Sequence, residues 1–351
     1  MVTGGLGPTC DDITRETAAS LLGRRLILNE EVKAGIEKYF TLTGRKMTEN
    51  NLRQAMVPEG AILLPNDRGT APGLILTDES GHSIAMMPGV PSEMVNMFEK
   101  ELRPWLLSRR HGTLVSRNIG IFGKGESAVE SILKPMMDYG VNPTVAPYAK
   151  EGEVRIRVTA FADSEKEAKS LCDAKVNEIL STEGVGEFVY GVDTGSIEAS
   201  LVAHLRAKGL TISCAESCTG GLAAKRIVDV AGCSDVFVGG AVTYSNDAKV
   251  RLLGVKKETL DRFGAVSEQT AAEMAEGVRQ ALGTDLGIST TGIAGPGGGS
   301  PEKPVGTVFV AVSSKQGVKV RRLSLSPMRD RDYIRYVSAS HALHLALRET
   351  E

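Results

Sequence analysis

The stretch LTISCAESCTGG (Leu210–Gly221) decides how the last part of this chain folds. It begins with apolar residues typical of a buried strand and ends in a Gly-Gly pair, and the helical pattern LAAKRIVDV follows at once. Downstream, the strand patterns DVFVGGAVTYS, DLGISTTG and GTVFVAVSS occur with the helical patterns SEQTAAEMAEGVRQALG and DYIRYVSASHALHLALRE. Strands alternating with helices predict βαβ units, and therefore an α/β domain with a mainly parallel sheet.

Three polar motifs follow predicted strands of this domain: SCAES, TYSN and TTGIAGPGGG. In sheets of this kind, ligands bind beyond the carboxyl ends of the strands. We therefore expect the three motifs to meet at one edge of the sheet and to form a ligand site there.

The chain has 351 residues, which is enough for two or three domains. Residues 1–112 alternate glycine loops, helical patterns and short apolar runs, which predicts a first α/β domain. Residues 113–190 show a strand, a helix, two strands and a helix, which is typical of a small α+β module. Turn residues in GEFVYGVDTGS put the next boundary near Gly191, so the last domain covers residues 191–351.

Composition excludes several classes of partner. The formal net charge is −2 and charges of both signs are interspersed, so no basic arm for nucleic acid and no membrane patch is expected. No apolar run approaches the roughly 20 residues needed to cross a bilayer. The five cysteines are odd in number and irregularly spaced, and the chain shows no signal-peptide pattern, which favours free thiols in the cytoplasm.

The stretch CAESCTGG offers two thiols and one serine for chemistry. A zinc site would need a second cysteine pair, so Cys214 is predicted to be a buried strand residue. Thiol catalysis by Cys218 would need a histidine, and none lies in the glycine-rich motifs. Ser217 sits at a strand-to-helix turn, where it is either a helix cap or a nucleophile near stabilising N–H groups. A serine without histidine needs a base such as Lys249 in TYSNDAK, whose alternative is an ordinary surface lysine.

The loop TTGIAGPGGG (Thr290–Gly299) is rich in glycine, so its backbone can approach an anion closely. The alternative is a flexible surface loop. No Gly-Lys-Ser/Thr follows the glycines and no GxGxxG opens a helix, which argues against ATP and dinucleotides. The phosphate of a mononucleotide is the ligand that the loop favours.

Several motifs resemble one family in order along the whole chain. AESCTGGLAA, GGAVTYSNDAKVRLLGV, GAVSEQTAAEMAEGVR and TTGIAGPGGGSPEKPVGTVFVAV resemble the CinA C-terminal family, the nicotinamide-nucleotide amidases also called PncC. TGGLGPTCDDITRETAA, GTAPG and MPGVPSEM resemble the molybdopterin-binding-type domain of full-length CinA. FGKGES with NPTVAPYAKEGEVRIRVTA is similar to its small KH-like middle module.

This resemblance implies deamidation of nicotinamide mononucleotide to nicotinate mononucleotide and ammonia, without a metal or other cofactor. It makes Ser217 the nucleophile and Lys249, assisted by Tyr244, the base. Thr291 and backbone N–H groups would hold the tetrahedral oxyanion. The substrate-binding residues that we predict are Glu216, Thr219, Gly220, Gly221, Asn246, Gly292, Gly295, Gly297 and Gly298.

The same resemblance implies that the first domain hydrolyses the pyrophosphate of ADP-ribose with a divalent cation, and with potassium. Asp11 and Asp12 would hold the cation beside a glycine loop, although acidic residues in a first helical turn are also ordinary capping features. The nucleotide site that we predict comprises Gly4, Gly5, Thr9, Asp11, Asp12 and Glu93.

The sequence departs from the family pattern in two places. Only Met1 and Val2 precede TGGLGPT, where relatives carry a strand-helix-strand segment, so we expect the leading strand to be lost. Asp11 and Asp12 should then be poorly held and ADP-ribose hydrolysis weak. The KH-like module lacks the Gly-x-x-Gly loop of KH domains, because the glycines of FGKGES are only two apart, so RNA binding is not expected. We expect this module to be a structural or dimer-forming spacer. We expect a homodimer.

A second class of function is a non-enzymatic interaction protein linked to competence and DNA damage, in which the ligand loops are only scaffold. The presence of Ser217, Tyr244, Lys249 and Thr291 favours the enzyme.

Overall fold

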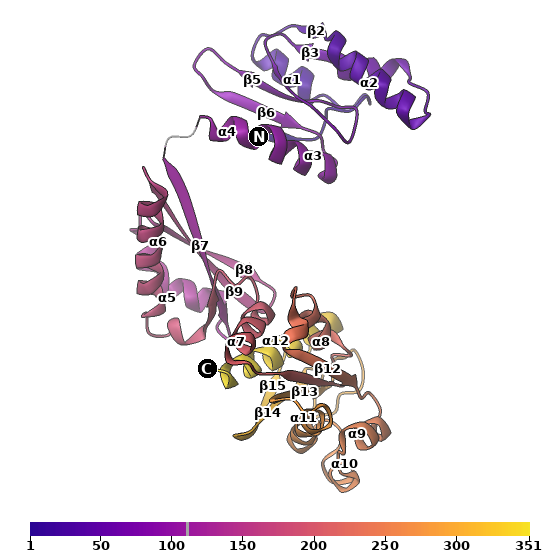
Figure 1. Ribbon diagram of the computed structural model, residues 1–351, viewed down its shortest axis with the longest axis vertical. Helices are drawn as coiled ribbons and strands as arrows, with labels where there is room; N and C mark the ends of the chain where they lie inside the picture. The colour runs from indigo at the N-terminus through magenta and orange to yellow at the C-terminus, as the bar shows by residue number, and fades with distance from the viewer. Residues whose placement is uncertain (110–111) are drawn as a thin grey trace. The chain divides into compact units, whose positions relative to one another are not determined.

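The computed structural model describes residues 1–109 and 112–351 and divides the chain into two compact units (Figure 1). The first unit precedes residue 112, and the second runs from Gly112 to Glu351. Within the described residues, no helix combines the length and the apolar character needed to span a membrane.

The first unit is an α/β domain. Its main sheet has the order β1-β6-β5-β4, with β1 parallel to β6 and the other pairs antiparallel. A separate antiparallel pair joins β2 and β3. The strands are β1 (Val2–Thr3), β2 (Leu26–Leu28), β3 (Met56–Pro58), β4 (Ile62–Leu64), β5 (Gly73–Thr77) and β6 (Ser83–Met87). The helices are α1 (Thr14–Leu21), α2 (Glu30–Thr43), the 3-10 helix η1 (Glu49–Ala55), α3 (Pro91–Met97), the π-helical turn η2 (Phe98–Leu102) and α4 (Arg103–Leu107).

Two expectations for this unit need correction. Among the helical patterns of residues 1–112, MTENNLRQAMV forms no α-helix: it forms the 3-10 helix η1 and then enters β3, where Met56–Pro58 pair with β2. The leading strand, expected to be lost, forms a two-residue strand: Val2 pairs with Met86 and Thr3 with Met87. Both strand residues are exposed rather than buried. The backbone pairing with β6 is enough to place the glycine turn that follows.

The second unit begins with the KH-like module, an antiparallel sheet of order β10-β7-β9-β8. Helices α5 and α6 pack against this sheet around buried aliphatic side chains such as Ile119, Val129 and Ile156. The strands are β7 (Thr113–Phe122), β8 (Thr144–Lys150), β9 (Glu153–Ala162) and β10 (Val189–Val192). The helices are α5 (Glu126–Asp138), α6 (Glu165–Leu180) and the 3-10 helix η3 (Gly186–Phe188).

The rest of the second unit contains a five-stranded sheet of order β12-β11-β13-β14-β15. The pairs β12–β11 and β11–β13 are parallel, and β14 and β15 extend the sheet antiparallel. The strands are β11 (Ile212–Glu216), β12 (Phe237–Val242), β13 (Leu286–Gly292), β14 (Thr307–Ser314) and β15 (Gly317–Ser324). The helices are α7 (Ile197–Lys208), α8 (Leu222–Val228), the 3-10 helix η4 (Cys233–Asp235), α9 (Asn246–Leu253), α10 (Lys257–Phe263), α11 (Glu268–Leu282) and α12 (Arg331–Glu349).

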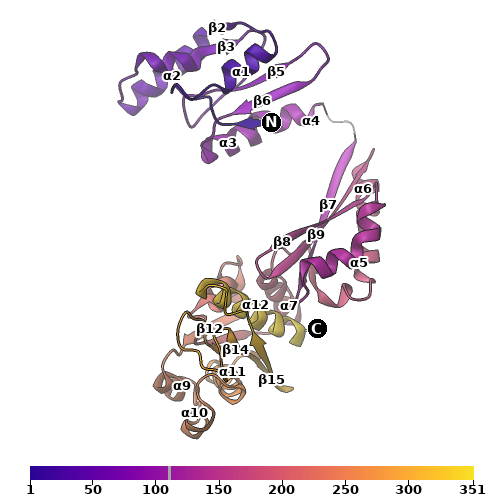
Figure 2. The ribbon, with the colours of Figure 1, turned by 180° about the vertical axis from the view of Figure 1, so that it is seen from behind.

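Successive residues of β11 face two different helical layers, as the alternation of a strand requires. Cys214 is fully buried in the core that α7, α8 and α12 share, which confirms the prediction for this cysteine. Ala215 packs on the other face, against Leu253 of α9 and Met274 of α11. The sheet therefore lies between two layers of helices (Figure 2).

The strand register brings the predicted motifs together. Glu216, the last residue of β11, pairs with Val242 of β12 on one side and with Thr290 of β13 on the other. The motifs SCAES, TYSN and TTGIAGPGGG thus leave neighbouring parallel strands at the same edge. This confirms that the three motifs meet at one edge of the sheet.

The KH-like module and the five-stranded domain share a packed contact within the second unit. The ring of Phe122 at the end of β7 lies 4.7 Å from that of His341 and 4.8 Å from that of His344, both on α12. Arg348 of α12 donates to the backbone carbonyls of Glu187 and Val189. Burial lowers the pKa of both histidines, so they serve as neutral packing groups.

Candidate functional site

Ser217 occupies the tight turn between β11 and α8. Its N–H donates to the carbonyl of Thr290 at 2.9 Å, which extends the β11–β13 ladder by one residue. Gly220 and Gly221 follow with φ of 59° and 93°, a left-handed backbone conformation that residues other than glycine rarely adopt. The Gly-Gly pair thus allows the chain to turn directly into α8, and it leaves Ser217 9% exposed at the sheet edge.

The side chain of Glu216 stabilises the conformation of this turn. Its buried carboxylate accepts four hydrogen bonds: from the Thr219 hydroxyl and from the N–H groups of Gly221, Ala223 and Ala224. A carboxylate at a helix N-terminus is stabilised by those N–H groups and by the helix dipole. Glu216 was predicted to bind substrate, and the structure instead commits both of its oxygens to the turn. It also occupies the N–H groups of α8 that we expected to stabilise negative charge on a ligand.

Lys249 reaches Ser217 from the neighbouring helix α9. Ser245 caps α9 by accepting from the Ala248 N–H, and Gly254 ends the helix in the left-handed conformation. This short helix directs Lys249 inward, where it is 1% exposed and its Nζ lies 3.1 Å from Ser217 Oγ. The same nitrogen donates to the carbonyl of Thr243 at 2.8 Å and to that of Tyr244 at 3.4 Å.

The surroundings of Lys249 favour its neutral form. No carboxylate of the described chain forms an ion pair with it, and burial lowers the pKa of its amine below the ordinary 10.5. A neutral amine has two N–H donors and one lone pair. With the two N–H groups directed at the carbonyls of Thr243 and Tyr244, the lone pair is left to face the Ser217 hydroxyl.

Cys218, next to Ser217, is a poor nucleophile. Its side chain is buried, and this burial raises the pKa of the thiol to about 12. The thiolate, which is the reactive form, is therefore scarce at neutral pH. The neighbouring Glu216 carboxylate opposes a second negative charge as well.

Tyr244 lies at the site, but its hydroxyl does not assist Lys249 directly. In the segment between β12 and α9, Thr243 is buried and Tyr244 is 63% exposed. Its hydroxyl accepts a hydrogen bond from Arg331 Nη2 at 3.2 Å, and only its carbonyl meets Lys249. The predicted assistance by the Tyr244 side chain is not seen in these contacts.

Arg331 is a site residue that the sequence reasoning missed. It is the first residue of α12, and its guanidinium joins Tyr244 to the glycine loop by donating to the carbonyl of Gly295 at 2.7 Å. Four residues later on α12, Arg335 donates to the carbonyl of Thr219 at 2.8 Å. A cation in the first turn of a helix opposes the helix dipole, and this unfavourable placement was a signal of function in the sequence.

The glycine loop and β13 form another side of the site. The Thr291 hydroxyl, predicted to hold an oxyanion, donates to the carbonyl of Ala265 at 2.7 Å. Gly295 is buried with φ of 78°, whereas Gly297 and Gly298 are exposed at the loop tip. Gly292 and Asn246 lie at the ends of β13 and α9 that face this edge. Thr219 is fully buried: its hydroxyl donates to Glu216, and its carbonyl accepts from Arg335.

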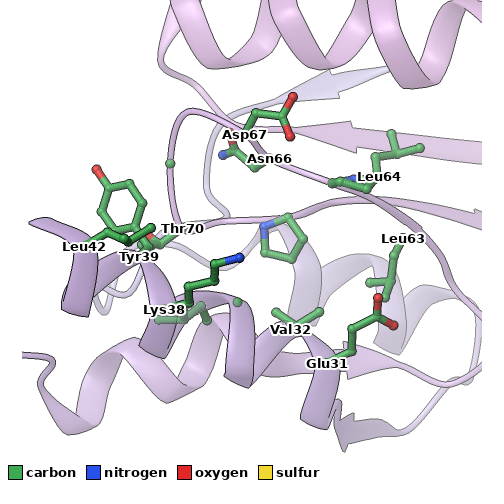
Figure 3. Close-up of a pocket in the computed structure, with 15 residues that line it drawn as sticks. Glu31, Val32, Lys38, Tyr39, Leu42, Leu63, Leu64, Asn66, Asp67 and Thr70 are labelled. Carbon is green, nitrogen blue, oxygen red and sulfur yellow. The ribbon is translucent and has the colours of Figure 1, made fainter.

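The first unit carries a separate hollow of about 480 Å³ lined by Gly4, Gly5, Asp12 and Glu93 among others. Glu93 accepts from Asn66 Nδ2 at 2.8 Å, and a side chain at Gly69 would collide with the same carboxylate. A neighbouring hollow of about 400 Å³ shares Tyr39, Gly69 and Thr70 with the first and lies between α2 and the segment after β4 (Figure 3).

Asp12 is better held than the sequence suggested. Its Oδ2 accepts from the Thr9 N–H at 2.9 Å and from the Thr9 hydroxyl at 2.5 Å, and the hydroxyl bond in particular lowers the pKa of the carboxyl. Asp11 and Thr9 are exposed and do not line the hollow. Within the described ranges, no group of three or more His, Cys, Asp or Glu side chains is placed to hold a metal ion.

Comparison with known proteins agrees with this architecture. Residues 194–350 match the CinA C-terminal domain, residues 116–191 the "Damage-inducible protein CinA KH domain", and residues 1–108 the "Probable molybdopterin binding domain". A "CinA-like protein" of Kosmotoga olearia is 48% identical over 348 residues, 99% of this chain and 83% of that protein. Another of Dictyoglomus thermophilum is 46% identical over 343 residues, 98% of this chain and 82% of that protein.

A solved structure is similar to part of this chain. The "competence/damage inducible protein CihA" of Agrobacterium tumefaciens is 43% identical, with a TM-score of 0.42, over 43% of this chain and 93% of that one. The order of the three matched domains and the identity to relatives over nearly the whole length agree with each other. The chain belongs to the CinA family.

Proposed function

We propose that the last domain hydrolyses nicotinamide mononucleotide to nicotinate mononucleotide and ammonia, with Ser217 as nucleophile and Lys249 as base. The observation that carries the proposal is the buried contact of 3.1 Å between Lys249 Nζ and Ser217 Oγ. A serine beside a lysine whose pKa is lowered by burial is a known route to an activated nucleophile without histidine.

The reaction follows from these contacts. Ser217 Oγ attacks the carboxamide carbon while its proton moves to the Lys249 amine, and backbone N–H groups at the site would donate to the oxyanion. The C–N bond then breaks, and Lys249 returns the proton so that nitrogen leaves as ammonia. An acyl ester remains on Ser217. Water attacks this ester with Lys249 again taking a proton, which releases the carboxylate product and restores the serine.

Arg331 is the residue that we assign to the phosphate of the substrate. Its guanidinium donates to two neutral acceptors, Gly295 O and Tyr244 Oη, and forms no ion pair with a carboxylate of the described chain. A guanidinium has five N–H donors, so donors remain for an anion beside the glycine loop. In this proposal Tyr244 orients Arg331 rather than Lys249.

For the first unit, the hollow that contains Asp12 and Glu93 favours a second activity, hydrolysis of the pyrophosphate of ADP-ribose. Mg²⁺ is commonly bound by one or two carboxylates together with substrate phosphates, and Asp12 and Glu93 fit that donor set. The cation would neutralise phosphate charge when bound.

The alternative of a competence- or damage-related interaction protein predicts no ammonia release from nicotinamide mononucleotide, so an ammonia assay on purified protein separates the two classes. The predicted homodimer stays a prediction.

Replacement of Ser217 by alanine should abolish ammonia release, because Ser217 is the hydroxyl within hydrogen-bond distance of the Lys249 amine and Cys218 stays a protonated thiol. The matched change Cys218→Ala should leave most of the activity, since that thiol stays protonated. Steady-state ammonia release from both variants measures the difference. A Ser217→Ala variant with normal activity beside an inactive Cys218→Ala variant would assign the chemistry to the thiol.

Lys249→Met should lower turnover by about 10²- to 10⁴-fold, the usual contribution of general-base help. Lys249→Arg introduces a permanently charged group that cannot act as a base, so it should be equally impaired. In the unmodified chain, the neutral fraction of Lys249 grows as pH rises through its lowered pKa, so kcat/KM should rise with pH and level off below 10.5. An active Lys249→Arg variant would show that a positive charge, not a base, is required.

Arg331→Met should raise KM for nicotinamide mononucleotide about 10- to 100-fold, the value of a charge-assisted hydrogen bond of roughly 1.5–3 kcal/mol. Nicotinamide riboside, which lacks the phosphate, should be a much poorer substrate that this change does not affect further. Arg329→Met is the control, because Arg329 is a nearby exposed arginine that stacks on Tyr333. Equal efficiency of the unmodified protein toward the two substrates would refute the phosphate assignment.

A further inference from the structure

Helix α8 carries the nucleophile turn at its start. Ser217–Gly221 lead directly into Leu222–Val228, a helix about 10 Å long at 1.5 Å per residue. Glu216 ties the turn to the first N–H groups of this helix by three of its four hydrogen bonds. The turn and α8 therefore move as one body, and whatever fixes α8 also fixes Ser217.

Arg226 is the buried anchor of α8. Its Nη2 donates to Glu198 of α7 at 2.7 Å, and its Nη1 donates to the Ser340 hydroxyl of α12 at 2.6 Å. The guanidinium also lies over the ring of Tyr336, 4.6 Å from the centroid. Its side chain is only 5% exposed, so the orientation of this cation depends on the groups around it.

The other carboxylate beside Arg226 comes from the KH-like module. Glu153, the first residue of β9, has a side chain that is 1% exposed, and its Oε1 lies 4.0 Å from Arg226 Nη2. That oxygen has no hydrogen-bond partner, and the Nε of Arg226 has none either. The buried carboxylate of Glu153 and the partly buried carboxylate of Glu198, from different modules, thus both lie close to Nη2 of one buried guanidinium.

Glu153 is itself held in place. Its Oε2 accepts from the Tyr190 hydroxyl of β10 at 2.8 Å and lies 3.6 Å from Nζ of Lys150, a lysine at the solvent edge. Tyr190 lies directly over Gly120 of β7, where an added Cβ would come within 2.2 Å of the tyrosine ring. The absence of a side chain at Gly120 is what lets Tyr190 reach the carboxylate.

We propose that Glu153 is a positioning residue for Ser217, acting from the KH-like module through Arg226 and helix α8. The buried charge of Glu153 attracts Arg226 together with Glu198, and the two carboxylates set the position of the helix that carries the nucleophile turn. Loss of that charge leaves Arg226 attracted to Glu198 alone, and α8 shifts with it. The KH-like module then contributes a residue that positions the nucleophile of the amidase, and it is more than a spacer. The inference rests on the proposed function only in taking Ser217 as the nucleophile.

The test uses the full chain and a reagent that reports on Ser217 without the substrate. An aryl sulfonyl fluoride reacts with a serine when Oγ bonds to sulfur and fluoride leaves, with the serine proton passing to Lys249. Mass spectrometry of the peptide that contains Ser217 gives both the rate constant and the final extent of modification. The variants are Glu153→Gln, which removes the charge but keeps an acceptor for Tyr190, and the control Lys150→Gln on the solvent side of the same carboxylate.

We expect Glu153→Gln to lower the rate constant of Ser217 modification and kcat by about 10- to 100-fold, as misplacement by ~1 Å can. The final extent of modification and KM should stay unchanged, and Lys150→Gln should behave as the unmodified chain. In a variant that is merely less folded, the final extent of modification and the midpoint temperature of unfolding would fall, while the rate constant of modification would not. The double variant with Arg226→Lys should be no slower than the slower single variant, because both act through one contact.

Equal rate constants for Glu153→Gln and Lys150→Gln would overturn the inference. If Glu153→Gln fails to fold, Arg226→Lys alone decides, since it keeps the charge but shortens the reach to Glu153: an unchanged rate constant there would also overturn it. Modified Ser217 without ammonia release from nicotinamide mononucleotide would contradict the proposed substrate and leave this inference standing. No modification of Ser217 in the unmodified chain would contradict the nucleophile and this inference together.

Discussion

The contact between the Lys249 amine and Ser217 is the interaction on which the rest of this structure depends. A buried ammonium without a carboxylate partner is costly, and a protein usually avoids that cost by keeping the amine neutral. Here two backbone carbonyls take the N–H groups of the amine, and the serine hydroxyl takes the remaining position. The burial that makes the lysine a base therefore also orients it, with no third side chain required.

The fold must hold two separate elements for this contact to exist. Ser217 stands at the end of β11, and Lys249 stands on α9, which follows the neighbouring strand β12. The turn is fixed by Glu216, whose buried charge is balanced by the N-terminal N–H groups of α8. Helix α9 is fixed by its caps and by close packing on α11, where Gly277 leaves room for the carbonyl of Leu253. Each of these devices uses backbone groups, which are less mobile than long side chains.

The sequence was sufficient for the local parts of this account. The alternation of strands and helices predicted the sheet, and the rule for parallel strands brought Ser217, Lys249 and the glycine loop to one edge. The contacts that the sequence did not reveal join residues far apart in the chain: Arg331 with Gly295, and Glu153 with Arg226. Tyr244 lies near Lys249 as expected, but the contact of its hydroxyl with Arg331 joins residues 87 positions apart and depends on the folded chain. Glu216 was taken for a ligand residue because the donors that occupy its oxygens become visible only once the turn is folded.

The central claim is that Ser217 becomes acylated during turnover. The most direct measurement is rapid acid quenching of the purified chain with nicotinamide mononucleotide, followed by mass spectrometry of the peptide that contains both Ser217 and Cys218. We expect an adduct equal to the substrate minus ammonia, attached to Ser217. The same adduct on Cys218, with none on Ser217, would contradict it.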